Sequence, residues 1–442
     1  MLVAATRGFC LWALTLAGLA GLAAPAPALA QTRADEVVDA PLGLLNREER
    51  RLLSPALDDG PVLLVDRLPE DLPAIVLAAR VHASPAQVMN VLTRPESYPH
   101  FMPALDHVRV TSRRGAQLAY DWSWRLAVFT LRGQNVMTTL PGSTARGYRL
   151  DVRATGGDLG VGRMTWRVHP DPAGSLVVFS SRLDMRDANW VSGRLEAGGR
   201  SVNRSINIAL ATVMLMGSAR EAERVAGYQS PSPPSERPPM TMATMDLDAL
   251  TPLLARGDLA FFHMRGDTLD EVTVAARLLT TVEPAQEVLN DPEAFSRSLI
   301  NGAHAEVLEQ SDEGTLFDWG VSLPLIGVDG RMRLSHDGEA MTVEGVSGAL
   351  EHGRWRFDTH RFPSGEGCIY GVGRFDPRET SAIVRSLIGD DAFFAHGLTA
   401  AMQIMVVRSI RKRAIERAVA DAAAAHAAGG VDDAPEGVSL DP

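Results

Sequence analysis

The sequence predicts an α+β fold that occurs twice in the chain. Apolar and polar residues alternate in runs such as 118–126 and 148–153, which is the period of antiparallel strands with one buried and one solvent-facing side. A long helical segment, 203–226, follows these strands, and a second one spans 393–420. A short helix, a run of strands and a long helix, in this order, form the plan of an α+β protein.

An internal repeat is the third observation behind this fold class. Residues 78–80 (Ala-Ala-Arg) recur as 275–277, and 121–122 (Asp-Trp) recur as 318–319, both at an offset of 197. From Gly162 onward the offset becomes 191, as expected if one copy has a shorter hairpin. One register held over so long a span indicates a tandem duplication.

The repeat, together with local composition, divides the chain into five segments. We expect a signal peptide at 1–30, a first domain at 44–228, a linker at 229–245, a second domain at 246–420 and a disordered tail at 421–442. Five prolines favour an extended, semi-rigid linker. The tail is rich first in Ala and then in Gly, Asp and Pro.

The first thirty residues have the pattern of a secretory signal peptide. Arg7 precedes an apolar run from Phe9 to Ala24, and residues 28–30 (Ala-Leu-Ala) fit a cleavage site. The run is shorter than the roughly 20 residues that span a bilayer, which argues against a permanent anchor. We therefore expect a periplasmic or secreted protein that keeps one cysteine, Cys368, and has no internal disulfide.

The first elements of copy one have local causes in the sequence. Asn46, with Glu49 three residues later, predicts a capping box at the start of a short helix. Strands are expected at 62–65 and 74–81 because apolar residues dominate there. A proline at the first helical position predicts a second helix over 85–92.

Composition and charge exclude several functions. The chain has 442 residues, 45% of them hydrophobic, and a formal net charge of −11, which disfavours a nucleic-acid partner. Its one lysine, Lys412, leaves little scope for lysine chemistry. The sequence lacks a His-Glu-x-x-His motif, a phosphate-binding loop and a Gly-x-Ser-x-Gly elbow. We therefore expect no metal and no cofactor, and we identify no catalytic motif.

After the second helix comes the segment 95–103, Pro-Glu-Ser-Tyr-Pro-His-Phe-Met-Pro. This segment and the order of elements resemble the START-like (SRPBCC) superfamily, particularly its coenzyme-Q-binding and polyketide cyclase/dehydrase branch. The resemblance implies two tandem helix-grip domains, in each of which a curved antiparallel sheet wraps a long C-terminal helix. It also implies that Tyr98 and Phe101 lie near a cavity entrance. In copy two, residues 292–299 lack two of the prolines and one aromatic, and Phe295 replaces Tyr98.

Members of this superfamily bind lipids, quinones, sterols or polyketides, and only some are enzymes. The candidate ligand-binding residues are inward-facing aromatic residues and methionines, although their period fits core residues as well as pocket walls. An empty cavity of about 300 Å³ would cost on the order of 7 kcal/mol, so a pocket must be small, wet or filled. The candidates are Tyr98, Phe101, Trp122, Trp124, Met137, Trp166 and Met214 in copy one, and Phe295, Trp319, Met341, Trp355, Met402 and Met405 in copy two.

Polar residues shared by the copies are better explained by the scaffold. The alternation that turns Trp122 inward turns Asp121 outward, and it does the same for Asp318 in copy two. His107 also faces outward, because Val108 lies on the inner side of its strand. We therefore name no catalytic residue among them.

We expect an exported protein that binds a hydrophobic small molecule in its helix-grip cavities and carries or buffers it. One alternative is a cyclase- or hydrolase-type enzyme that uses Asn135 or Gln134 in the same cavity. Another is a scaffold without a pocket. We expect a monomer that makes at most transient contact with membranes, since its net charge is negative.

Overall fold

The computed structural model describes most of the chain between Leu42 and Ala428. The expected signal peptide, most of the expected linker and the end of the expected tail lie outside the described residues. The described residues are 42, 44–67, 74–126, 129–158, 160–184, 200–230, 245–291, 295, 303–323, 326–338, 340–379, 385, 389 and 391–428.

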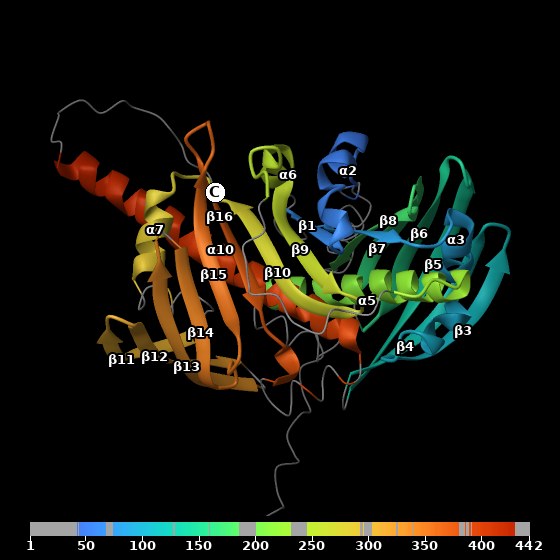
Figure 1. The fold of residues 1–442 in the computed structure, drawn as a ribbon. Helices are drawn as coiled ribbons and strands as arrows, with labels where there is room; N and C mark the ends of the chain where they lie inside the picture. Colours follow the sequence, from blue (N-terminus) through green and yellow to red (C-terminus); the bar gives the residue numbers. More distant parts are fainter. Residues whose placement is uncertain are drawn as a thin grey trace, which may run out of the picture.

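Among the described residues, one antiparallel sheet of 16 strands runs through both copies (Figure 1). The first copy supplies β1 (Val62–Asp66), β2 (Ile75–Val81), β3 (Leu105–Arg114), β4 (Gln117–Leu126), β5 (Phe129–Ser143), β6 (Gly147–Gly157), β7 (Val161–Asp171) and β8 (Gly174–Asp184). The second copy supplies β9 (Gly257–Arg265), β10 (Thr268–Arg277), β11 (Ala303–Ser311), β12 (Gly314–Leu323), β13 (Ile326–Asp337), β14 (Ala340–Gly348), β15 (Arg354–Arg361) and β16 (Gly367–Arg374).

The two halves of the sheet have the same strand order. From the junction outward, the first half is β1-β2-β8-β7-β6-β5-β4-β3 and the second is β9-β10-β16-β15-β14-β13-β12-β11. They meet where β1 pairs antiparallel with β9. The duplication is therefore also a structural one, with both copies in one continuous sheet.

Two long helices lie across one face of this sheet (Figure 1). They pack against each other, and Gly397 permits the close approach: a Cβ there would lie 2.6 Å from the Cα of Ala209. Each long helix packs on strands of its own copy, which confirms the α+β class with two helix-grip domains. The helices are α2 (Arg47–Leu53), α3 (Pro85–Leu92), α5 (Arg200–Ala226), α6 (Thr251–Arg256), α7 (Glu283–Asn290) and α10 (Ala392–Ala428), with 3₁₀ helices η1 (Ala56–Asp58), η2 (Pro95–His100) and η3 (Pro377–Glu379).

Two hydrophobic cores lie on opposite sides of the sheet. The larger core fills the space between the sheet and the long helices of both copies. The smaller core covers the junction strands from the outer side, where Leu53 of α2 and Leu253 of α6 pack. Strands β1 and β2 are consequently buried on both faces, which explains their nearly uninterrupted apolar sequences.

Buried ion pairs lie next to the β1–β9 junction, and one of them joins the two copies. Asp258 of β9 is fully buried and binds Arg408 and Arg411 of α10, while Arg67 of the first copy lies 3.8 Å from the same carboxylate. Burial alone would raise the pKa of Asp258. The arginines outweigh this effect and hold the pKa at about 2.

Local predictions agree with the structure at several places. The capping box of Asn46 and Glu49 is present, and α3 has the predicted bounds. However, α10 continues to Ala428, so residues 421–428 are helical rather than part of a disordered tail. These residues are mostly alanine, which has the highest helix propensity.

By length and composition alone, α10 could also cross a membrane, and it is the one helix in the described ranges that could. In its apolar window, 61% is buried inside the protein. The role of α10 as the central helix of the second copy accounts for its apolar character.

Candidate ligand cavity

A cavity of about 60 Å³ lies between the sheet of the second copy and α10. Its walls come from strands β12 to β16, from α10 and from Phe295. This is the space that a helix-grip fold encloses between sheet and helix. The lining residues are Phe295, Trp319, Met332, Val343, Leu350, Trp355, Phe357, Gly373, Phe375, Thr399, Met402, Gln403, Met405 and Val406.

No residue in this lining carries a charge, and most of the lining is aromatic or aliphatic. Burying an unpaired charge here would cost several kcal/mol. The walls therefore favour a neutral molecule over an ion. Met402 and Met405 add flexible, polarizable side chains that can adapt to different shapes.

Gln403 is the exceptional residue of the cavity. Its side chain is 2% exposed, and both amide atoms, Nε2 and Oε1, lack a hydrogen-bond partner. The indole Nε1 of Trp319 is also buried without a partner. Thr399, in contrast, donates its hydroxyl to the carbonyl of Ala395 at 3.0 Å. The cavity thus offers one free acceptor and two free donor groups.

The structure brings together most of the residues predicted in copy two. Phe295, Trp319, Trp355, Met402 and Met405 all line the cavity. Met341 is absent from the lining and is fully buried in the larger core. The departure from the proline-aromatic pattern at 292–299 has therefore not abolished a cavity in this copy.

The corresponding residues of copy one pack in the core of the first half. Tyr98 does not lie at an entrance, because its ring is 2% exposed and its hydroxyl donates to the carbonyl of Leu92 at 2.6 Å. Phe101 packs edge-on against Tyr98, with ring centroids 5.7 Å apart. Trp124, Met137 and Trp166 are buried, and Trp122 and Met214 are partly buried against the same core.

A polar pair lies inside copy one. Asn135 is buried and donates its Nδ2 to the Tyr120 hydroxyl at 2.9 Å, whereas its Oδ1 has no partner. Burial raises the pKa of Tyr120 to about 12, although the hydrogen bond from Asn135 lowers it. Gln134, the other polar candidate, is exposed on the opposite side of its strand.

Sequence patterns missed Gln403 and Gly373. A polar residue that follows Met402 inside a buried helix was a signal for Gln403, since unpaired amides are rarely buried. Gly373 matters for the space it leaves: a Cβ there would lie 2.5 Å from Oε1 of Gln403. The spacing of hydrophobic residues along the sequence indicates neither the unpaired amide of Gln403 nor the space beside Gly373.

The polar residues assigned to the scaffold behave as expected. Asp121 pairs with Arg109, and Asp318 pairs with Arg331, on the outer side of the sheet. Among the described residues, no group of three or more His, Cys, Asp or Glu could hold a metal ion.

Residues 81–211 match the family model described as polyketide cyclase / dehydrase and lipid transport. The first copy is therefore similar to proteins of this family. The match begins at the last residue of β2 and ends within α5, so it covers β3 to β8 and the first part of the long helix. The resemblance inferred from the proline-aromatic segment is confirmed. No curated protein matches the chain.

Solved structures similar to this chain include an aromatase/cyclase, a di-domain ARO/CYC protein and human STARD10. The Zhui aromatase/cyclase from Streptomyces sp. R1128 has 17% identity, covers 36% of this chain and 99% of its own, and gives a TM-score of 0.32. The di-domain ARO/CYC StfQ from the steffimycin biosynthetic pathway has 10% identity, coverages of 78% and 99%, and a TM-score of 0.28. Human STARD10 has 12% identity, coverages of 48% and 84%, and a TM-score of 0.31.

Proposed function

We propose that this protein binds a neutral hydrophobic small molecule in the cavity of the second copy and carries or buffers it. The observation behind this proposal is an uncharged, largely apolar cavity that contains an unpaired buried amide, Gln403. The family description, which includes lipid transport, supports the same class of function. A ligand with a carbonyl or hydroxyl group would satisfy Gln403 while burying its apolar remainder.

The cavity is small enough to remain stable without a ligand. Its 60 Å³ has room for a few water molecules. A larger ligand must therefore move part of the wall. Met402 and Met405 are the side chains best suited to move, because methionine has three rotatable bonds and changes shape at low cost.

Native mass spectrometry of the purified full chain, followed by solvent extraction, tests this proposal. We expect a neutral lipid, quinone, sterol or polyketide at one molecule per chain. A short-chain benzoquinone then serves as the titration probe for delipidated protein. Gly373→Ala should weaken its binding, because the added methyl group occupies the cavity. Gly156→Ala, near the end of β6 in the first copy where a Cβ meets nothing within 4 Å, is the control.

The proposal fails if extraction recovers no such molecule and delipidated protein also ignores the probe. It also fails if Gly373→Ala binds the probe as tightly as the control does. A bound molecule whose affinity does not change when the cavity is filled would have to sit elsewhere on the chain.

The Tyr120–Asn135 pair favours a second candidate function, a cyclase- or dehydrase-type reaction in the first copy. Because Asn135 donates to Tyr120, the phenol proton remains available to a substrate carbonyl. The raised pKa keeps the phenol neutral, as a hydrogen-bond donor or general acid requires. Turnover of a poly-β-ketone probe that disappears in Tyr120→Phe would support this function, and turnover equal to the unmodified chain would reject it.

We also propose that the chain is exported and works in the periplasm or outside the cell, as the pattern of residues 1–30 suggests. N-terminal sequencing of the protein from the periplasmic fraction should begin near Gln31. An intact N-terminus in the cytoplasmic fraction would contradict export.

A further inference from the structure

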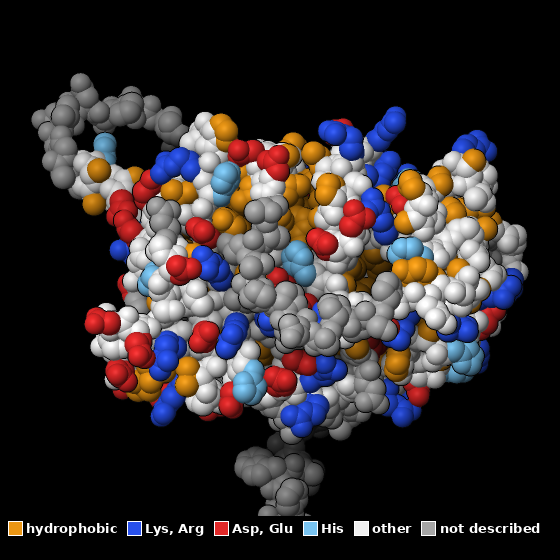
Figure 2. Space-filling model, viewed as in Figure 1, with side chains coloured by type: hydrophobic (Ala, Val, Ile, Leu, Met, Phe, Trp, Pro, Cys, Tyr) orange, Lys and Arg blue, Asp and Glu red, His pale blue; other side chains and the backbone are white. Residues whose placement is uncertain are grey.

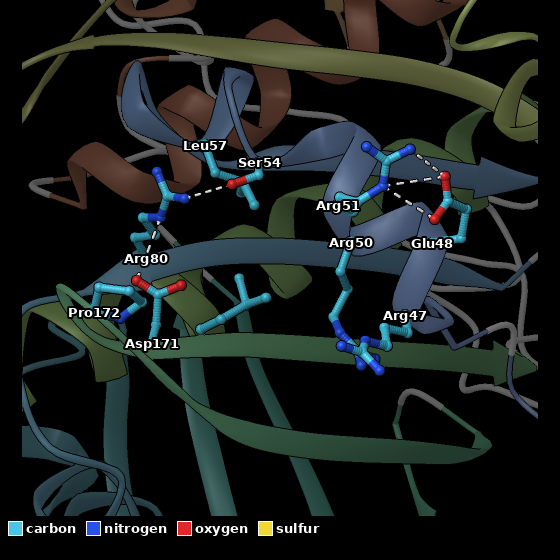
Figure 3. Close-up of a pocket in the computed structure, with 10 residues that line it drawn as sticks. Arg47, Glu48, Arg50, Arg51, Ser54, Leu57, Arg80, Asp171 and Pro172 are labelled. Atoms are coloured by element: carbon cyan, nitrogen blue, oxygen red, sulfur yellow. Dashed lines mark hydrogen bonds and ion pairs between the residues drawn. The ribbon is translucent and has the colours of Figure 1, made fainter.

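A cleft of about 720 Å³ opens on the outer face of the first copy, on the side of the sheet away from the long helices (Figure 3). It lies between α2, η1 and the turn that joins β7 to β8. In Figure 2, Lys and Arg side chains gather over α2 at the top of the view. Its lining residues are Arg47, Glu48, Arg50, Arg51, Ser54, Leu57, Arg80, Asp171, Pro172 and Leu176.

Two of the four lining arginines are neutralised within the cleft. Arg51 binds Glu48 of the same helix. Arg80 binds Asp58 and lies 3.5 Å from Asp171. The charges of these arginines are thus already compensated, and they contribute little to the attraction of a further anion.

The other two arginines belong to a basic cluster, defined here as Arg47, Arg50, Arg167 and His169. Figure 3 shows Arg47 and Arg50 extending from α2 in the same direction. Burial lowers the pKa of Arg50, and the neighbouring Arg167 and Arg47 lower it further. Burial, with Arg50 and Arg167, lowers the pKa of His169 to about 4, so this ring is neutral at pH 7.

Within the part of the chain that the structure describes, no carboxylate is paired with the basic cluster. Arg50 donates to the carbonyl of Leu45 at 2.8 Å. Its acidic neighbour Glu49 is bound instead to Arg256. The Nε atom of Arg167 and the Nε2 atom of His169 are buried without a hydrogen-bond partner. Three positive charges therefore meet at one place in a protein whose net charge is negative.

The second copy shows that the fold does not require this cluster. The register of the sheet identifies the equivalent positions. In the first copy, Arg167 lies opposite Val178 on the next strand, and Val178 lies opposite Ala78. In the second copy, Asp358 lies opposite Tyr370, and Tyr370 lies opposite Ala275. Since Ala78 and Ala275 are repeat counterparts, Asp358 occupies the position of Arg167.

The histidine next to this position also differs in its partner. His360, the counterpart of His169, lies 3.0 Å from Asp248 through its Nε2 atom. The second copy therefore forms the same strands with Asp358 at the position of Arg167 and with Asp248 beside the histidine. The arginines without a carboxylate partner are thus a property of the sequence of the first copy and not a requirement of the fold.

We propose that the basic cluster and the adjoining cleft form a binding site for a phosphate group. Arginine guanidinium groups present planar, bidentate donors that match phosphate oxygens. A phosphate group would also relieve the repulsion among Arg47, Arg50 and Arg167. The phosphate could belong to a soluble compound or to a lipid headgroup. This site lies on the other side of the sheet from the cavity and does not depend on the proposed function.

The test uses the full chain with three probes: inorganic phosphate, vesicles of phosphatidylcholine with phosphatidylglycerol, and vesicles of phosphatidylcholine alone. We expect binding to inorganic phosphate, to the anionic vesicles or to both, and no binding to the neutral vesicles. Raising the salt concentration from about 0.05 M to about 0.3 M should weaken it, because the cluster is partly exposed. Phosphate binding alone would identify a soluble source, and vesicle binding would identify a lipid headgroup.

Two variants test the residues. Arg50→Gln and Arg167→Asp should each weaken binding about tenfold or more, since each removes charged hydrogen bonds. Arg167→Asp should still fold, because the second copy carries aspartate there, and circular dichroism melting checks this. Arg224→Gln, an exposed arginine on α5 outside the cleft that is paired with Glu221, is the control and should change binding less than about threefold. The proposal is overturned if neither phosphate nor anionic vesicles bind, or if the two variants bind like the control.

Discussion

Leu63 pairs with Ala260 at the β1–β9 junction, and the two residues are also each other's counterparts in the 197-residue repeat. On either side, Val62 pairs with Phe261 and Leu64 pairs with Leu259. The repeat counterpart of Val62 is Leu259, and the counterpart of Phe261 is Leu64. The repeat therefore converts the first of these pairs into the second. The junction therefore has the self-complementary geometry of a two-fold dimer interface, within one chain.

Because the sheet and both cores cross this junction, we expect the two copies to unfold together. Leu63→Ala should lower the stability by about 2–5 kcal/mol, as other large-to-small changes in cores do. The loss should shift one shared transition instead of splitting it in two. Denaturant unfolding followed by circular dichroism and by tryptophan fluorescence checks this, since both copies contain tryptophan. Two separate transitions in the unmodified chain would contradict it.

Asp258→Asn should be strongly destabilising. The carboxylate is fully buried and compensates Arg408 and Arg411, so its loss leaves buried cations without a counter-ion. Breaking such a pair costs about 3–5 kcal/mol. As a control, Glu48→Gln removes an exposed pair and should cost less than about 1 kcal/mol in the same urea titration.

Asp258 also predicts an acid limit to stability. Its pKa in the folded protein, about 2, is lower than the value near 4 of an unfolded chain. Its contribution is therefore complete above about pH 4 and is lost as the pH falls toward 2. The Asp258→Asn variant should show a flatter dependence of stability on pH in this range, and parallel curves for the variant and the unmodified chain would refute the assignment.

His396, at the start of α10, predicts a second window at higher pH. Burial lowers its pKa from 6.5 to about 4; nearby Arg378 also lowers it, while Asp376 opposes the shift. The unfolded chain takes up a proton at this residue first, so stability should fall as the pH drops from about 6.5 toward 4. His396→Gln should reduce this slope in thermal melts at several pH values. An unchanged slope would show that other groups dominate.

Gln403→Leu should raise the stability of the unliganded protein by about 1–3 kcal/mol, because it removes a buried amide without partners. Thr399→Val, in contrast, removes a hydroxyl group that is hydrogen-bonded and should not stabilise. Chemical denaturation of both variants without ligand checks this. Equal effects of the two changes would mean that Gln403 has a partner, such as a bound water.

The fold could be predicted from local signals to a large extent. The capping box of Asn46 and Glu49, the proline at the start of α3 and the alternation in β4 are each properties of a few neighbouring residues. The single continuous sheet could not be predicted. The Leu63–Ala260 pair is one of many pairings open to an apolar strand, and the proline-rich linker suggested separate domains.

The cavity residues that could be predicted are those that follow from the regular spacing of apolar residues along a strand or helix. Residues whose role depends on contacts between distant segments of the chain could not be predicted. Trp319 and Met402 follow from the period of their elements. The basic cluster could not be found this way, because α2 supplies Arg47 and Arg50 while β7 supplies Arg167 from more than a hundred residues away. Only the folded sheet brings these like charges together.

The β1–β9 junction also reduces the exposure of the chain to aggregation. Two separate sheets would present four free edges, whereas the fused sheet, in the part of the chain that the structure describes, ends at β3 and β11. Both end strands carry exposed charges: Arg109 and Arg113 on β3, Glu306 and Glu309 on β11. Charged edges resist pairing with further copies. Fusion at β1 and β9 therefore shields these two largely buried strands from intermolecular association.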